Sequence, residues 1–433
     1  MGIDYIKTAT RTAASGESDV RGTVERMLAE IESGGEDVAR RYARDLDGWE
    51  GEIAVPRERI AEAAEQVPQA IKDDIRFAYD RVRRFAEAQR DSLTSFEIEV
   101  SPGVWAGQRN VPMTGAGCYV PGGRYSHLAS ALMSVATAKV AGVQHVTACS
   151  PPRGGEGIPS AVLYALDHCG ADTILTMGGV QAVASMAFGL FTEQPADILV
   201  GPGNQFVAEA KRALFGRVGI DLFAGPTEIL VIADDTADPD ILSADLVGQA
   251  EHGSNSPVWL ITLSHGLAET VAERTQARID ALPEPNRTNA HEAWRDCGEI
   301  AVAGSPVEAA ALSDRYAPEH LEVHAADLDW WLANLSSYGS LFLGEETTVA
   351  YGDKTSGPNH ILPTKGAARY TGGLSAVKFL KTLTYQRMSR EANREIGSVT
   401  ARMSRLEGME AHARSADARL AKYFQDETFD LAY

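Results

Sequence analysis

Residues 115–150 read GAGCYVPGGRYSHLASALMSVATAKVAGVQHVTACS, and this stretch decides the fold class. A short run of β-forming residues leads into a glycine-rich turn, a long helical segment and a second short apolar run. The same unit recurs further along: DTILTM leads through a Gly-Gly turn into VQAVASMAFGLF, and DILV leads through GPGN into QFVAEAKRALFG. Strands that alternate with helices over short turns predict a doubly wound parallel sheet of the α/β class.

The segments on either side of this stretch extend the same picture. Residues 20–92 carry apolar side chains at helical spacing, and residues 96–120 cluster β-forming residues. A second α/β stretch runs from about 236 to 350, and residues 395–423 predict a long amphipathic helix or a helix pair. We therefore expect two doubly wound, Rossmann-like α/β domains with mostly parallel sheets, plus small helical pieces at the two ends. The expected boundaries are 1–20 for an N-terminal arm, 21–114 with 226–370 for the first domain, 115–225 for the second, and 371–433 for a helical C-terminal segment.

The composition narrows the classes of protein. The 433 residues include 40 Lys+Arg and 60 Asp+Glu, which gives a formal net charge of −20 and argues against binding to nucleic acid or to an anionic membrane surface. No apolar run approaches the roughly 18–20 residues of a membrane span, and the opening residues do not resemble a signal peptide. The four cysteines form no CxxC pair, which favours free thiols. We expect a cytoplasmic enzyme or binding protein.

Two short motifs combine an imidazole with a second polar group. Gln249 and His252 in GQAEHG are three residues apart near a predicted helix end, which places both on one helix face and suits two ligands of one metal. Glu319 and His320 in YAPEHLEV put two proton-transfer groups on a proline-stiffened turn. Taken singly, a polar pair and a hydrogen-bonded structural histidine are the alternatives.

Two further pairs lie towards the C-terminus. Asp353 and His360 bracket a Gly-Pro turn in YGDKTSGPNHILPT, a loop composition that suits a binding site as well as a structural turn. Glu407 and His412 lie in LEGMEAH on the predicted C-terminal helix, where a lone histidine is more often structural.

Two glycine turns lie between a strand and a helix, where backbone N–H groups can face an anion. They are GPGN at 201–204 and the Gly-Gly pair at 178–179. The dinucleotide fingerprint GxGxxG is absent, because Phe206 or Val207 stands where its third glycine would be. A tight turn that needs positive φ is the alternative explanation.

Taken together, the motifs resemble one family. The segments VGPGNQFVAEAKR, FAGPTEILVIAD, QAEH, APEHLE, SGPNHILPT and EGMEAHA occur in the order and rough spacing of the histidinol dehydrogenases, over roughly residues 20–425. The resemblance implies an enzyme with one zinc per subunit that uses NAD twice, oxidising a primary alcohol through an aldehyde to a carboxylate. It also implies a homodimer with shared active sites, in which the C-terminal helix reaches the partner.

The same resemblance implies the roles of individual residues. His320 would take the hydroxyl proton, and Glu319 would activate water for the second oxidation. The implied zinc ligands are Gln249, His252, Asp353 and His412, the implied substrate contacts are Thr227, His360 and Glu407, and the implied NAD contacts are Tyr119, Gln181 and Asn204.

Some segments depart from the typical histidinol enzyme. Arg124, Tyr125 and His127 occupy a turn where the family commonly has a small residue and then Ala-Pro, and Thr227 stands where Ser is common. Together with QAEHGSNSPVWLIT and DLDWWL, these features resemble the sulfopropanediol 3-dehydrogenase branch. The implied small-molecule substrate is 2,3-dihydroxypropane-1-sulfonate, oxidised to 3-sulfolactate.

Arg124 offers a physical reason for that branch. A guanidinium attracts a permanent sulfonate anion and would repel cationic histidinol. The alternative is that Arg124 pairs with the NAD pyrophosphate or with a surface carboxylate. For the whole protein, the alternatives are histidinol dehydrogenase itself, a zinc-binding protein without turnover, and a zinc hydrolase.

Overall fold

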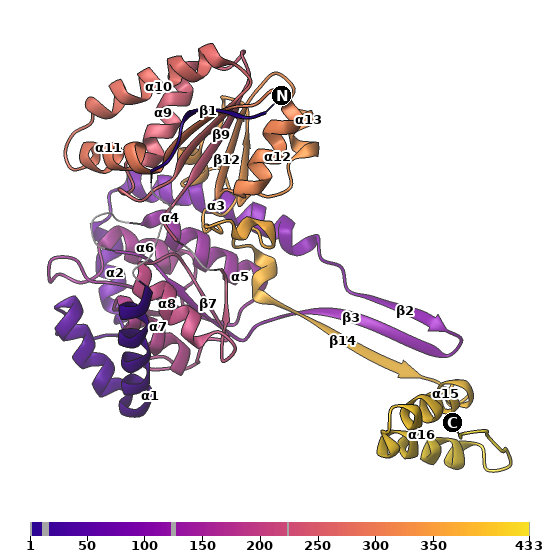
Figure 1. Ribbon diagram of the computed structural model, residues 1–433. Helices are drawn as coiled ribbons and strands as arrows, with labels where there is room; N and C mark the ends of the chain where they lie inside the picture. Colours follow the sequence, from indigo (N-terminus) through magenta and orange to yellow (C-terminus); the bar gives the residue numbers. More distant parts are fainter. Residues whose placement is uncertain (1, 11–16, 123–126, 223–224, 433) are drawn as a thin grey trace. The chain divides into compact units, whose positions relative to one another are not determined.

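The computed structural model describes residues 2–10, 17–122, 127–222 and 225–432 (Figure 1). The chain forms two compact units, Met1–Arg90 with Met113–Phe379, and Asp91–Pro112 with Leu380–Tyr433. The larger unit contains two mostly parallel sheets covered by helices, which confirms the expected α/β class. No helix within the described ranges is long and apolar enough to cross a lipid bilayer.

The first sheet of the larger unit has six strands in the order β1-β11-β10-β9-β12-β13. All neighbours pair in parallel except β1, which lies antiparallel at the edge beside β11. The strands are β1 (Asp4–Lys7), β9 (Ile229–Ala233), β10 (Val258–Thr262), β11 (Gly298–Val302), β12 (His320–His324) and β13 (Ser340–Leu343).

Helices cover both faces of this sheet (Figure 1). Ile229 and Val231 pack towards α9, α10 and α11, whereas the alternate residues Leu230 and Ile232 pack towards α12 and α13. This alternation is the period-two pattern of a strand buried on both faces. The helices are α9 (Pro239–Ala250), α10 (His265–Asp280), α11 (Asn286–Cys297), α12 (Pro306–Tyr316) and α13 (Leu328–Asn334), with the short α14 (Val349–Gly352) after β13.

The second sheet has five parallel strands in the order β6-β5-β4-β7-β8. They are β4 (Gly115–Tyr119), β5 (His145–Ser150), β6 (Thr173–Thr176), β7 (Ile198–Val200) and β8 (Gly219–Ile220). The surrounding helices are α1 (Glu17–Asp47), α2 (Arg57–Gln66), α3 (Gln69–Asp91), α4 (Leu128–Ala131), η1 (Leu132–Ala136), α5 (Thr137–Ala141), α6 (Ser160–His168), α7 (Gly179–Phe188) and α8 (Gln205–Leu214). Because the strand order reverses between β4 and β7, the loops after these two strands meet at a topological switch point, the usual ligand crevice of such sheets.

The smaller unit is an antiparallel sheet followed by two packed helices. The sheet has the order β14-β3-β2, with β2 (Phe96–Ser101), β3 (Val104–Pro112) and β14 (Leu380–Met388). The helices are α15 (Asn393–Leu406) and α16 (Glu410–Tyr423), which is the predicted helix pair. Two 3-10 turns, η2 (Ala367–Arg369) and η3 (Ala376–Phe379), precede β14.

Candidate active site

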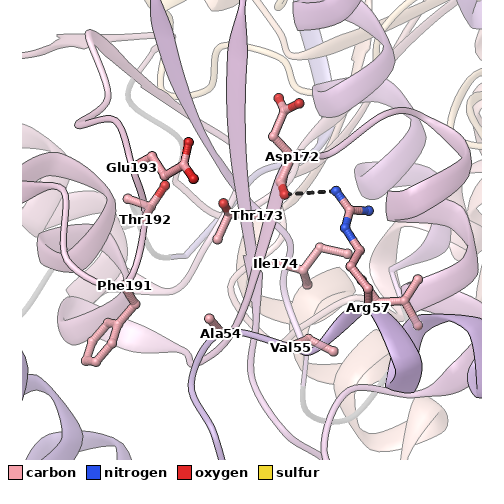
Figure 2. Close-up of a pocket in the computed structure, with 10 residues that line it drawn as sticks. Ala54, Val55, Arg57, Asp172, Thr173, Ile174, Phe191, Thr192 and Glu193 are labelled. Atoms are coloured by element: carbon pink, nitrogen blue, oxygen red, sulfur yellow. Dashed lines mark hydrogen bonds between the residues drawn. The ribbon is translucent and has the colours of Figure 1, made fainter.

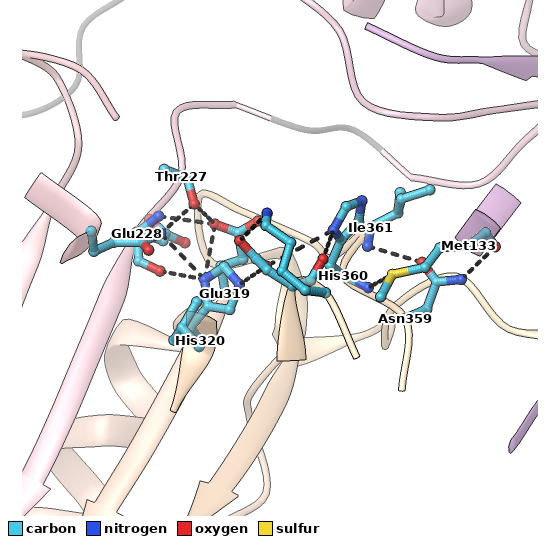
Figure 3. Close-up of polar contacts among 12 residues, drawn as sticks. Met133, Thr227, Glu228, Glu319, His320, Asn359, His360 and Ile361 are labelled. Atoms are coloured by element: carbon cyan, nitrogen blue, oxygen red, sulfur yellow. Dashed lines mark hydrogen bonds and ion pairs between the residues drawn. The ribbon is translucent and has the colours of Figure 1, made fainter. Parts of the chain in front are cut away.

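The predicted catalytic pair lies at the start of β12. Glu319 and His320 are both buried, with 7% and 3% exposure. Glu319 Oε2 accepts hydrogen bonds from Thr227 Oγ1 at 2.7 Å and from the Glu228 backbone N–H at 2.9 Å (Figure 3). Thr227 and Glu228 directly precede β9, and β9 pairs with β12. The amino ends of two neighbouring parallel strands therefore hold the glutamate in a fixed position.

His320 presents one free nitrogen. Its Nδ1 lies 3.0 Å from the Glu228 carbonyl oxygen, which can only accept, so in the neutral imidazole Nδ1 carries the proton. The 3.5 Å approach of the Gln249 amide nitrogen to Nδ1 is therefore not a hydrogen bond in this tautomer. Nε2 is buried, has no hydrogen-bond partner among the described residues, and lies 3.9 Å from Asp353 Oδ1. When the ring is neutral, this nitrogen can accept a proton.

The charges around His320 make it unusually basic. Burial alone would lower its pKa. The charge and hydrogen bond of Glu319 and then the charge of Asp353 outweigh this effect and raise the pKa of His320 to about 9. In its neutral form such an imidazole is a stronger base than a free histidine.

Glu228, which the sequence did not single out, also has a raised pKa, which for a carboxyl group favours the neutral form. Burial, and next the charge of Glu319, raise its pKa from the ordinary 4.5 to about 8, although the Lys365 backbone N–H donates to it at 3.0 Å. The folded protein therefore binds more protons at this carboxyl than the unfolded chain does between those two values.

We expect the stability of the wild type to fall relative to Glu228→Gln as the pH rises through that window. Between those two values the unfolded chain ionises Glu228 while the folded protein keeps it protonated, which favours unfolding, whereas the amide does not ionise in either state, so the difference in unfolding free energy should change by a few kcal/mol. Urea unfolding of both proteins at pH values between about 5 and 8 measures this. The exposed Glu58→Gln is the control, and a difference that is independent of pH would contradict the raised pKa.

His320 opens onto a small cavity. Its volume is about 160 Å³, and it is lined among others by His320, Phe342, Asp353, Asn359 and His360. Sites for drug-sized ligands usually have roughly 300–1,000 Å³, so this cavity suits a small substrate.

A larger cavity of about 350 Å³ lies beside the five-stranded sheet (Figure 2). There the Arg57 guanidinium contacts the Asp172 carbonyl at 3.2 Å and the Asp167 carboxylate at 3.2 Å. None of the sequence-predicted site residues lines it, and we assign the chemistry to the smaller cavity.

His360 joins the loop that carries Asp353 to the helices of the other sheet (Figure 3). Its Nδ1 lies 3.1 Å from the Asp353 carbonyl oxygen, and its Nε2 lies 2.9 Å from Ser130 Oγ in α4. The neighbouring Asn359 donates to the Met133 carbonyl at 2.8 Å. The loop that lines the cavity is therefore held by hydrogen bonds to the helices beside the five-stranded sheet. Burial lowers the pKa of His360, which favours the neutral imidazole.

Three of the four expected metal ligands lie in the larger compact unit. Gln249 is buried near the end of α9 and donates a hydrogen bond to Thr227 Oγ1. His252 is exposed just beyond the helix end, and Asp353 lies beside His320. The pKa of His127 is lowered by burial and then by the charges of His360, Lys354 and His252, while Asp353 raises it. The charges of His252 and Asp353 therefore both influence His127.

The remaining sequence-predicted residues lie elsewhere. Glu407 follows α15 and His412 is in the first turn of α16, and both are exposed in the smaller unit. Arg124 and Tyr125 fall outside the described residues.

The expected NAD contacts surround the switch point of the five-stranded sheet. Tyr119 ends β4, and its hydroxyl accepts a hydrogen bond from the Gly179 backbone N–H at 3.1 Å. Gln181 in α7 is buried and donates to Asp47 at 2.9 Å, while exposed Asn204 caps α8 by accepting from two backbone N–H groups. Asp47 was not recognised from the sequence, because it lies far away along the chain.

The GPGN turn needs its first glycine. Gly201 has φ of 115°, and a Cβ at this position would lie 2.0 Å from the Tyr119 carbonyl oxygen. A buried ion pair holds the turn from below, because Asp221 accepts from the Gly201 N–H at 2.8 Å and Lys211 donates to the Gly201 carbonyl at 3.0 Å. The carboxyl end of β4 and the turn after β7 are thus fixed against each other.

Known proteins match this chain along its whole length. A sequence model of the histidinol dehydrogenase family matches residues 10–420. The sulfopropanediol 3-dehydrogenase of Ruegeria pomeroyi is 61% identical over 431 residues, covering 100% of this chain and 99% of that protein. A histidinol dehydrogenase of the same organism is 42% identical, covering 84% of this chain and 83% of that protein.

A solved structure agrees with these matches. The crystal structure of histidinol dehydrogenase from Elizabethkingia anophelis superimposes with a TM-score of 0.89 at 32% identity, over 94% of each chain. The chain therefore belongs to the histidinol dehydrogenase family, a family of NAD-linked oxidoreductases that act on CH–OH groups.

Proposed function

We propose that this protein is a zinc- and NAD-dependent dehydrogenase that oxidises 2,3-dihydroxypropane-1-sulfonate to 3-sulfolactate in two steps. The observation that carries the chemistry is the buried Nε2 of His320, which has no hydrogen-bond partner among the described residues and belongs to a ring at the small cavity whose Nδ1 lies 3.4 Å from the Glu319 carboxylate. The substrate rests on the 61% identity to a sulfopropanediol 3-dehydrogenase, against 42% to a histidinol dehydrogenase of the same organism.

In the first step, His320 acts as the base. Its Nε2 would take the proton from the hydroxyl oxygen as the carbon that bears it is oxidised to an aldehyde, and bound NAD would supply the hydride acceptor. The hydrogen bond from Nδ1 to the Glu228 carbonyl fixes the ring, so that the lone pair of Nε2 stays directed at the cavity.

In the second step, Glu319 acts as the base. It would take one proton from the water that adds to the aldehyde; bound NAD would accept the hydride of the hydrate, whose remaining acidic proton would pass to solvent as the carboxylate forms. Thr227 and the Glu228 N–H hold Glu319 Oε2, which keeps this carboxylate close to His320.

The residues present suit a zinc ion. The Gln249 amide nitrogen lies 3.5 Å from His320 Nδ1 and Asp353 Oδ1 lies 3.9 Å from His320 Nε2, so both side chains lie beside this ring. An amide oxygen, an imidazole and a carboxylate are ligands that zinc accepts. We assign the metal to Gln249, His252 and Asp353 of one subunit, with His412 supplied by the second subunit of the proposed homodimer. A bound zinc would orient the substrate and polarise its oxygen.

The proposed NAD contacts lie around the five-stranded sheet, whereas the proposed catalytic pair lies on the six-stranded sheet. Tyr119, Gln181 and Asn204 would bind NAD, and the close approach of Gly201 to Tyr119 supports a ligand at this switch point. Thr227, His360, Glu407 and Arg124 would bind the substrate, with Arg124 on the sulfonate.

We also propose a homodimer with shared active sites, which would explain the exposed apolar surface of the smaller unit. Its sheet and helices expose many large apolar side chains, which a partner subunit would cover. They include Phe96, Ile98, Val100, Leu383, Tyr385, Met403 and Leu406.

The test is an assay for NADH with each substrate. The sulfonate diol should give two NADH per molecule oxidised, and histidinol should give little. Histidinol dehydrogenase activity is the second candidate, favoured by the match to the Elizabethkingia anophelis enzyme, and a preference for histidinol would establish it instead. No NADH from either substrate would contradict both.

A further inference from the structure

A second group of ionisable side chains lies further along β12. Glu322 and His324 follow His320 at period two on the strand face that packs against α9, while Leu321 and Val323 belong to the core on the opposite face. Asp245, one helical turn before Gln249, reaches this group from α9. The side chains of Glu322 and His324 have 0% and 1% exposure, and that of Asp245 has 13%.

Each carboxylate in this group uses only one of its oxygens. Thr348 Oγ1 donates to Asp245 Oδ1 at 2.8 Å, and the Val349 N–H donates to Glu322 Oε1 at 2.8 Å. Among the residues that the structure describes, Asp245 Oδ2, Glu322 Oε2 and both ring nitrogens of His324 have no hydrogen-bond partner. Four of the nine such buried atoms among the described residues thus belong to one site, which indicates that these groups serve a ligand.

The spacing of these free atoms is that of metal ligands. His324 Nε2 lies 3.6 Å from Glu322 Oε2 and 3.9 Å from Asp245 Oδ2, too far apart for hydrogen bonds. Zinc binds nitrogen and oxygen at about 2.0–2.2 Å in a tetrahedron, which sets its ligand atoms roughly 3.3–3.6 Å apart. A small inward movement would bring all three atoms to bonding distance.

The charges of the group also call for a divalent cation. Burial and then the charge of Glu322 raise the pKa of Asp245 to about 7. With both carboxylates ionised the group carries a charge of −2, and a protonated His324 would still leave −1 in the protein interior, which is costly. A divalent ion would neutralise the pair. The Thr348 hydroxyl and the Val349 N–H already orient the two carboxylates, as hydrogen bonds to metal-binding carboxylates commonly do.

We propose that Asp245, Glu322 and His324 bind a zinc ion, in a site separate from the one around Gln249 and Asp353. The ion would cross-link α9 to β12, the two elements that also carry Gln249 and His320. The partly exposed edge of Asp245 gives the ion a path of entry.

The first test counts zinc in the full-length protein. After incubation with zinc chloride and desalting, elemental analysis should find two zinc ions per wild-type chain and one in Asp245→Asn, which keeps an oxygen for Thr348. His252→Ala is the matched variant for the other site and should also hold one. An Asp245→Asn protein that retains as much zinc as the wild type overturns the proposal.

These outcomes separate the new site from the proposed catalytic metal. If His252→Ala keeps the wild-type zinc content while Asp245→Asn loses one ion, the new site stands and the catalytic assignment fails. If Asp245→Asn does not fold, anomalous diffraction at the zinc edge from wild-type crystals decides. A peak bonded to Glu322 and His324 supports the proposal, and its absence there overturns it.

Discussion

Replacing His320 by Asn should reduce kcat for NADH formation by about 10²–10⁴-fold, the usual contribution of a general base. The Asn amide can still donate a hydrogen bond to the Glu228 carbonyl, as His320 Nδ1 does, but nothing replaces Nε2 at the cavity. The substitution therefore removes the proton acceptor and preserves the local contact. Initial rates at saturating NAD and substrate measure the loss.

The loss should be confined to the chemical step. NAD affinity, measured by fluorescence titration, should stay within about threefold, because the proposed NAD contacts lie on the five-stranded sheet. The exposed His265→Asn serves as the control for a histidine substitution of the same kind. A variant that keeps more than about a tenth of the wild-type kcat would remove His320 from the role of base.

The fold class could be predicted because its pattern is local. In residues 115–150 the strand, turn, helix and strand follow one another directly, and β4, the helical run from Leu128 to Ala141, and β5 occupy the expected places. The burial of the strand that follows Glu319 was harder to predict from the sequence. HLEVH alternates polar and apolar residues, as a half-exposed strand would, yet β12 is buried on both faces.

The site could be predicted only where the resemblance supplied it, because its geometry depends on distant segments. The spacing of Gln249 and His252 suggested one helix face, but α9 ends at Ala250, so His252 lies outside the helix and is exposed while Gln249 is buried. The sequence also gave no reason to select Glu228, whose raised pKa depends on Glu319 across a strand pair.

The group around His324 was missed although a signal was present. His320, Glu322 and His324 alternate in HLEVH, so a strand here would place all three on one face. The third member of the group, Asp245, lies on a helix far away in the sequence, and only the packing of α9 on β12 brings it close.

Replacing Glu319 by Gln should stop the reaction at the aldehyde. The Gln side-chain carbonyl can accept the hydrogen bonds of Thr227 and the Glu228 N–H, so the geometry survives, but an amide cannot take a proton from water. We expect the second oxidation to slow by about 10²–10⁴-fold, while the first, which depends on His320, continues. An aldehyde-trapping hydrazine should then capture the intermediate, and each diol should yield one NADH instead of two.

The stoichiometry distinguishes this outcome from a general loss of activity. In the wild type, the trap should capture little aldehyde and the ratio of NADH to diol should stay at two. Glu345→Gln, an exposed glutamate of the same unit, should behave like the wild type. If Glu319→Gln still forms two NADH per diol at the wild-type rate, another group activates the water. If both oxidations fail equally and the variant remains folded, the carboxylate acts by sustaining the basicity of His320, since its charge is the largest of those that raise that pKa.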